Sequence, residues 1–160
     1  MESNIAAVLG RTPSGLYIAT VQDGNGNETG MLASWVQQAS FEPPAITVAV
    51  NKKRYLNDWL GATSKIALSL IGESQKEYLG HFGRGFEPDQ PAFDGVETTK
   101  TPGGMSVLSG SLGWIEGEVS GQLDSGDHIV YLVQLTHGQP TEQIESEAPW
   151  VHLRRSGDKY

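Results

Sequence analysis

Gly30-Met31-Leu32-Ala33-Ser34-Trp35-Val36-Gln37-Gln38-Ala39-Ser40-Phe41-Glu42-Pro43-Pro44 begins the most informative stretch of the chain. The stretch continues with Ala45-Ile46-Thr47-Val48-Ala49-Val50 and ends with Asn51-Lys52-Lys53-Arg54. It begins with small and polar residues and stops at two prolines, which cannot donate hydrogen bonds to a β-ladder. The nearly all-apolar run that follows predicts a buried strand. Three consecutive cations then end the stretch.

Composition narrows the class of protein. The chain has 160 residues, a formal net charge of −8, 20 glycines and no cysteine. That length predicts one domain, 1–160, with its own core. The acidity disfavours a nucleic-acid-binding surface, and the lack of cysteine excludes disulfides and thiolate chemistry. Because no segment has the pattern of a membrane span or a secretory signal, we expect a cytoplasmic protein with neither nucleic acid nor membrane as partner.

Strand patterns dominate the chain. The turn cluster at 23–27 and the hairpin turn at 124–127 separate runs rich in apolar and β-branched residues. In one run, Ile115, Val119 and Leu123 are predicted on one face and Glu116, Glu118 and Ser120 on the other. We predict strands at 16–21, 29–38, 45–50, 65–71, 114–123, 128–136 and 150–153.

Helical patterns are few. Short helices are predicted at 55–60 and 73–82 from the spacing of apolar residues. The segment 83–104 is rich in Gly, Pro and acids and is predicted to be mainly loop, long enough to cover a site. This balance predicts a mainly β protein, a barrel carrying a few short helices.

Common catalytic motifs are missing. The histidines at positions 81, 128, 137 and 152 form no pair with metal-ligand spacing, so we predict no metal site. No nucleophile elbow occurs, and no motif favours a Ser–His–Asp triad. The glycines of 24–30 resemble a dinucleotide loop, but they join two predicted strands and open no helix, which favours a hairpin.

Two polar groups are candidate binding elements. Ser34, Gln38 and Ser40 share one strand face at a period of two and could hydrogen-bond the edge of a planar heterocycle. Asn51 and the cations of 52–54 directly follow a buried strand, so the core would fix them where a phosphate could bind. The alternative for these cations is a solvated loop, as charge runs usually are.

His128 is the third candidate. It begins a strand after the turn and could orient a ligand through a hydrogen bond. Its neighbour Asp127 is not expected to pair with it, because adjacent strand residues point to opposite faces.

In their order, several segments resemble the short-chain flavin reductase family, whose members have the FMN-binding split-barrel fold. The similarity runs from about Gly10 to Tyr160. Its version of the motifs is most similar to the C-terminal reductase module of phototroph flavodiiron proteins. The matching segments are Gly30-Met31, Ser34-Trp35-Val36, Gln38 to Pro44, Gly126-Asp127-His128 and His152 to Tyr160.

The resemblance implies roles for named residues. His128 would position the hydride donor, NADH or NADPH, near the flavin. FMN is the implied cofactor, with FAD as an alternative, and a homodimer, fused to or docked on flavodiiron domains, is the implied assembly. The implied cofactor-binding residues are Ser34, Trp35, Val36, Gln38, Ser40, Asn51, Lys52, Arg54, Phe82 and Tyr160.

Three functions remain open from the sequence. The first is an NAD(P)H-dependent flavin reductase, in which the cofactors supply the chemistry and the protein stacks and holds them. The second is a flavin-binding electron-relay module with little nicotinamide activity. The third is a cofactor-free barrel that mediates protein contacts, favoured by the absence of a dinucleotide fingerprint.

Overall fold

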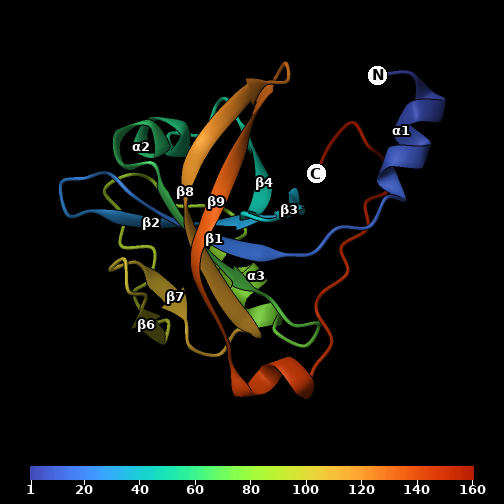
Figure 1. Ribbon diagram of the computed structural model, residues 1–160. Coiled ribbons are helices and arrows are strands. Elements are labelled where there is room, and N and C mark those ends of the chain that lie inside the picture. The colour runs from blue at the N-terminus through green and yellow to red at the C-terminus, as the bar shows by residue number, and fades with distance from the viewer.

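A seven-stranded antiparallel sheet forms the body of the computed structural model, which describes residues 1–160 (Figure 1). Its strand order is β2-β1-β5-β8-β9-β4-β3, and β6 and β7 form a separate pair. The strands are β1 Tyr17–Gln22, β2 Glu28–Ala33, β3 Val36–Phe41, β4 Pro44–Asn51, β5 Lys65–Leu70, β6 Thr98–Lys100, β7 Ser106–Leu108, β8 Gly113–Asp124 and β9 His128–Pro140.

The sheet closes because its two edge strands are consecutive in the chain. Only Ser34 and Trp35 separate the end of β2 from the start of β3. Two residues span only about 7 Å, so the edges must lie close together. The backbone N–H of Ala49 donates to the carbonyl of Trp35 at 3.0 Å, which ties this link to β4. The mainly β barrel predicted from the sequence is therefore confirmed.

Apolar side chains pack on both faces of the sheet. The larger cluster lies inside the barrel and includes Val21, Val48 and Val133, all fully buried. A second cluster lies between the sheet and α3 and includes Ile18 and Phe82. Strand β1 supplies both clusters because its successive side chains point to opposite faces.

Short helices lie outside the barrel sheet. They are α1 Ser3–Gly10, α2 Leu56–Thr63, α3 Lys76–Phe82 and the 3₁₀ helix η1 Glu142–Glu145. The helices predicted at 55–60 and 73–82 correspond to α2 and α3. The latter starts later than predicted because the Gln75 side chain accepts a hydrogen bond from the Gly72 N–H and closes a turn first. No helix combines the length and apolar character needed to cross a membrane.

Three strand predictions need correction. The run 29–38 is two strands, broken where the chain turns at Ser34 and Trp35. The simple alternation in 114–123 is wrong, because bulges at 116/117 and 119/121 shift the register, bury Glu116 and expose Leu123. The segment 150–153 is not a strand and makes only the isolated bridge between Ser14 and His152.

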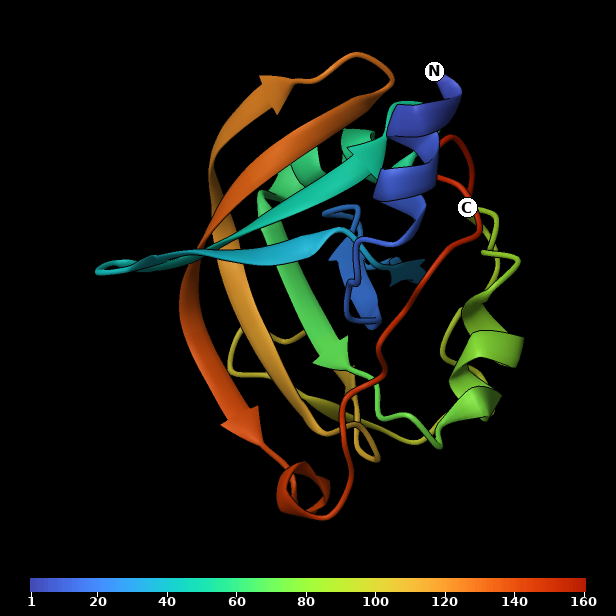
Figure 2. The same ribbon diagram turned by 90° about the vertical axis from the view of Figure 1, so that its right-hand side faces the viewer.

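Two segments lie outside the closed part of the barrel. The β3–β4 hairpin projects from it as a ribbon (Figure 2). The segment after η1 runs back along the barrel towards α1, and both chain ends lie near the same side (Figures 1 and 2). The segment 83–104, predicted to be mainly loop, also contains the short strand β6.

Candidate functional site

A pocket opens where β2 ends and the chain turns into β3. Its volume is about 250 Å³. One wall is the strip from Met31 to Ala33, followed by Ser34 and Trp35 at the turn. Strand β4 contributes Ala49 and Asn51, and Arg54 closes one end. The remaining lining residues are Leu16, Leu79, Gly83, His152 and Tyr160.

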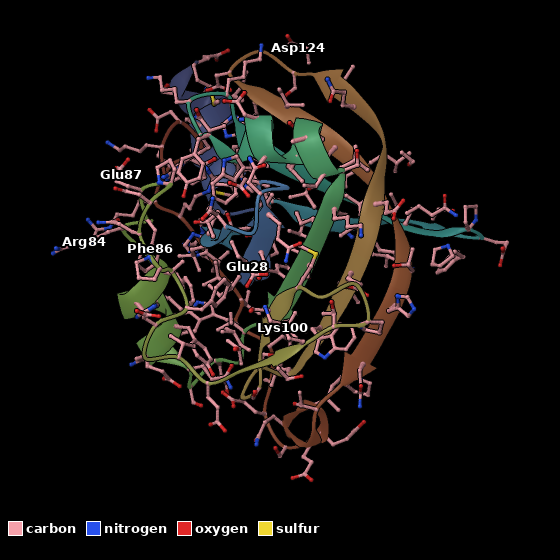
Figure 3. The ribbon with its side chains drawn as sticks, turned by 90° about the vertical axis from the view of Figure 1, so that its left-hand side faces the viewer. Glu28, Arg84, Phe86, Glu87, Lys100 and Asp124 are labelled. Atoms are coloured by element: carbon pink, nitrogen blue, oxygen red, sulfur yellow. The ribbon has the colours of Figure 1, made fainter.

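A basic depression lies beside this pocket, and Met31 and Arg54 line both. Lys53 and Arg84 also line it, and none of its three cations lies within salt-bridge distance of a carboxylate. Glu87 is the acidic residue at its rim. In Figure 3, Arg84, Phe86 and Glu87 lie together on the loop after α3.

Tyr55 fixes the shape of this basic depression. Its hydroxyl donates to the carbonyl of Phe86 at 2.7 Å and lies 2.8 Å from the hydroxyl of Thr29. Gly85 has φ +75°, and a Cβ there would lie 3.2 Å from Nη1 of Arg54. A glycine therefore lets the loop adopt a left-handed conformation and approach the guanidinium closely.

Lys52 does not join this group. Its backbone N–H donates to the carbonyl of Asp127, which places it against the β8–β9 turn. Its ammonium lies 2.7 Å from both carboxylate oxygens of Asp124. This hydrogen bond is the main cause that lowers the pKa of Asp124. Figure 3 shows Asp124 at the end of the β8–β9 hairpin, well apart from Arg84.

His128 lies behind the pocket in an aromatic cluster. It is only 5% exposed and pairs with Asn51 across β4 and β9. Its ring centroid lies 4.7 Å from that of Trp35, and the ring of Tyr160 lies 5.4 Å from Trp35. The Tyr160 hydroxyl lies 2.5 Å from Nε2 of His128.

The prediction that Asp127 and His128 do not pair is wrong. Asp127 lies in the turn before β9, so strand alternation does not separate the two side chains. Oδ1 of Asp127 lies 2.7 Å from Nδ1 of His128, and this hydrogen bond is the main cause that lowers the pKa of Asp127. A carboxylate at Nδ1 favours the tautomer that donates there and leaves Nε2 to accept from Tyr160.

The structure brings together only part of the predicted set. Ser34, Trp35, Asn51, Arg54 and Tyr160 line the pocket. Three others lie elsewhere in the barrel: Val36 is in the inner core, Phe82 is 1% exposed in the second cluster, and Lys52 is paired with Asp124.

Gln38 and Ser40 lie on the projecting hairpin, on either side of a β-bulge. The shared strand face predicted for Ser34, Gln38 and Ser40 does not exist. Ser34 precedes β3, and the bulge changes the alternation between the other two residues.

Several lining residues escaped prediction. Ala33 and Ala49 have no chemistry that would single them out. Arg84 was treated as part of a loop, although the flanking glycines of Gly83-Arg84-Gly85 were a signal for a tight approach. His152 lies in the matching segment 152–160, but neither its spacing nor the resemblance predicts a role for it. Burial, followed by the charge of Arg154, lowers its pKa.

The donor set fits a flavin nucleotide. An apolar strip from Met31 to Ala33 suits one face of a flat ring, and Ser34 and Asn51 can hydrogen-bond polar edges. Arg54 lies where the pocket meets the basic depression, so an anionic tail could leave the ring site there.

Comparison with known proteins agrees with this geometry. Residues 9–159 match the model of the "Flavin reductase like domain". The chain belongs to the flavin reductase-like domain family. It is 35% identical over 161 residues to Diflavin flavoprotein A 1 of Synechocystis sp., covering 100% of this chain and 28% of that protein.

Solved structures share the split-barrel fold. The NADH:FAD oxidoreductase SgcE6 of Streptomyces globisporus superposes with a TM-score of 0.83 and 22% identity, over 96% of this chain and 87% of that one. Flavin reductase PheA2 superposes with a TM-score of 0.74 and 22% identity, over 92% and 94%. This flavin reductase-like chain spans under a third of its diflavin relative, and no activity of that whole protein transfers to it directly.

Proposed function

We propose that this flavin reductase-like domain binds FMN and transfers a hydride to it from NADH or NADPH. The observation that carries the proposal is that the pocket and the basic depression are neighbours, with Met31 and Arg54 lining both. A ring site that opens into unpaired cations matches a planar heterocycle with a phosphate tail. SgcE6 has been solved in complex with NAD and FAD fragments, which supports a nicotinamide as donor and keeps FAD as an alternative to FMN.

Distinct residues would hold the two ends of FMN. Ala33, Ser34 and Trp35 would contact the ring system, and Asn51 would hydrogen-bond its polar side. Arg54 would bind the phosphate, assisted by Lys53 and Arg84 in the basic depression. Since Lys52 is paired with Asp124, we propose no phosphate contact for it. The roles predicted for Val36, Gln38, Ser40 and Phe82 stay predictions.

The chemistry asks little of the protein's acids and bases. When bound, the flavin supplies the electron acceptor for the hydride. His128 is the positioning residue for the donor. Asp127 orients its ring through the hydrogen bond at Nδ1, and strand pairing with Asn51 fixes its backbone. Holding two rings in a reactive arrangement lowers the activation free energy of hydride transfer. In favourable intramolecular reactions this effect is about 7 kcal/mol or more.

A homodimer is the assembly we propose. Strand β3 forms an edge of the sheet and carries no charged residue from Val36 to Phe41. Phe41 at its end is 87% exposed. Neutral, exposed edges favour pairing with another chain. Light scattering should give twice the chain mass, and Phe41→Glu should shift it towards the monomer. A monomeric wild-type protein would contradict the dimer.

One observation favours a second candidate, an electron-relay module. The relative from Synechocystis is more than three times longer than the matching region, so this flavin reductase-like domain could act beside other redox domains, including a flavodiiron core. In that case the flavin would receive its electrons from a neighbouring domain rather than from a nicotinamide.

Anaerobic reduction separates the two candidates. FMN-loaded protein is mixed with NADH or NADPH, and the flavin absorption band is followed. Bleaching with either donor supports the reductase. FMN binding without bleaching by either donor favours the relay. Failure of FMN to quench or change its fluorescence on titration would overturn both and leave the protein-contact barrel.

A further inference from the structure

Residues 154–160 reach the pocket through Tyr160. Tyr160 lines the pocket, although its residue surface is 71% exposed. Its hydroxyl reaches Nε2 of His128, and its ring packs against Trp35. The guanidinium of Arg154 lies 5.2 Å from the centre of the Trp35 ring. We call residues 154–160 the strap.

Helix α1 holds the strap in place. The N–H of Arg154 donates to the carbonyl of Gly10 at 2.9 Å, and the N–H of Gly157 donates to the carbonyl of Ala6 at 2.7 Å. Ala6 and Gly10 are the buried residues of α1, so the buried side of this helix is the side that meets the strap. Figure 2 shows α1 and the strap together at one side of the barrel.

Arg154 links the parts of this arrangement. Its Nη1 donates to the carbonyl of Lys159 at 3.5 Å, and its Nη2 donates to the carbonyl of Leu9 at 3.4 Å. These bonds are long and exposed, so each contributes little by itself. Apart from its two backbone hydrogen bonds to α1, the strap is therefore held by weak side-chain contacts that a competing ligand could replace.

Space in the pocket is short while the strap is in place. Its volume of about 250 Å³ lies below the range of about 300–1,000 Å³ typical of small-molecule sites. A hydride donor and acceptor must fit together, with reacting atoms about 3–3.5 Å apart. The exposed Tyr160 ring occupies the side of Trp35 and His128 that a second planar ring would need.

We propose that the strap is a gate: Tyr160 holds the pocket closed through its hydrogen bond to His128, and the nicotinamide donor displaces it. This inference rests on the proposed function, because it names what regulates access to that site. On opening, His128 exchanges the Tyr160 hydroxyl for the donor, while the Asp127 bond keeps its ring oriented. The strap and α1 contacts loosen together.

Gly157→Ala tests the gate. A Cβ at Gly157 would clash with Cβ of Leu9 and lie 3.1 Å from the carbonyl of Ala6, so the strap must move off α1. Gly61→Ala is the matched control, since a Cβ there meets nothing within 4 Å. A closed gate raises the donor's apparent dissociation constant, which equals the intrinsic constant divided by the open fraction. We therefore expect the half-saturating donor concentration to fall about threefold to tenfold in Gly157→Ala, with the limiting reduction rate retained.

The direction of this change decides between two roles. If the strap instead clamps a bound donor, Gly157→Ala should raise the half-saturating donor concentration, and the gate proposal is wrong. An unchanged half-saturating concentration would also contradict the gate. Tyr160→Phe keeps the ring and removes only the bond to His128, so it should lower the half-saturating concentration too. This variant decides the question if Gly157→Ala does not fold.

Hydrogen exchange supplies a readout independent of turnover. NAD⁺ or NADP⁺ added to FMN-loaded protein should speed amide exchange at Arg154 and Gly157, because their N–H groups lose their carbonyl acceptors on α1. Slower or unchanged exchange would overturn the gate while reduction by NADH or NADPH still supports the reductase. If neither donor reduces the flavin in the wild type or in Gly157→Ala, the proposed function fails and the gate with it.

Discussion

The ammonium of Lys52 forms a two-oxygen ion pair with Asp124, at 2.7 Å from each carboxylate oxygen, whereas Arg54, two residues later, has no carboxylate partner. The cations of one short run therefore have two different structural roles. Lys52 joins the end of β4 to the β8–β9 hairpin, and Arg54 faces the junction of the pocket and the basic depression.

Arg54→Ala should therefore weaken FMN much more than riboflavin, which has no phosphate. A charge-assisted hydrogen bond is worth about 1.5–3 kcal/mol, which corresponds to roughly a tenfold to hundredfold loss of affinity. Fluorescence titration with both ligands measures the ratio directly.

Lys52→Ala is the matched control for Arg54→Ala. It removes a cation two residues away whose ion pair with Asp124 is exposed to solvent and therefore contributes little to stability. The ratio of FMN to riboflavin affinity should stay at the wild-type value. An equal loss for the two ligands in Arg54→Ala would remove the phosphate role.

His128→Ala should slow flavin reduction at saturating donor by on the order of a hundredfold, the effect expected when a reactive arrangement is displaced by about 1 Å. Flavin affinity should be nearly unchanged, because His128 contacts Trp35 and Tyr160 and does not line the pocket. Stopped-flow reduction under anaerobic conditions measures the rate.

Asp127→Asn tests whether the carboxylate orients His128. An amide can still accept from Nδ1, but it loses the charge that strengthens this bond. We expect a smaller loss of reduction rate than in His128→Ala and no further loss in the double variant. Additive losses would show that Asp127 acts apart from the histidine.

Gly30→Ala should destabilise the fold. A Cβ at this position would lie 2.7 Å from Cε1 of the buried Phe82 and 3.0 Å from Cζ of Phe93. Overpacking of this kind costs about 1–3 kcal/mol. The midpoint of urea unfolding should fall, while Gly61→Ala, in open space on α2, should leave it equal or slightly higher. Equal midpoints for both variants would mean that the phenyl rings shift freely.

His152 should make the protein less stable below neutral pH. Burial, and then the charge of Arg154, lowers its pKa in the folded state relative to the unfolded value of about 6.5. Between the two pKa values the unfolded chain binds more protons, so stability falls as the pH drops through that window. Above the unfolded value the effect vanishes.

His152→Gln isolates this effect from the other histidines. Urea unfolding at several pH values from about 7.5 to 5.5 should give a smaller loss of stability for the variant than for the wild type. Parallel curves for the two proteins would contradict the lowered pKa.

Strand β4 was predicted from the sequence, whereas the register shifts in β8 were not. The apolar run 45–50 was recognisable because burial on both faces leaves no polar alternation. The break at Ser34 was not, since nothing in its neighbours forbids a continuous strand. The bulges of β8 depend on the pairing partner β9, which a single run of residues does not reveal.

The candidate site divides in the same way. Residues next to the β2–β3 turn and at the end of β4 were predicted from their own segment. Arg84 and His152 come from distant segments, and only the fold brings them to the pocket. The Asp127–His128 pair was missed because the boundary between the turn and β9 falls between the two residues.

The sequence by itself determined that the chain is mainly β and belongs among flavin reductase-like domains, because strand periodicity and ordered motifs are local properties of the chain. Only the tertiary structure decided which cation has no carboxylate partner and that Tyr160 lines the pocket. Lys52 is neutralised by Asp124, and Tyr160 reaches His128, through contacts across 72 and 32 positions of sequence. Such contacts depend on how the barrel closes, and short-range sequence patterns do not determine which distant residues meet.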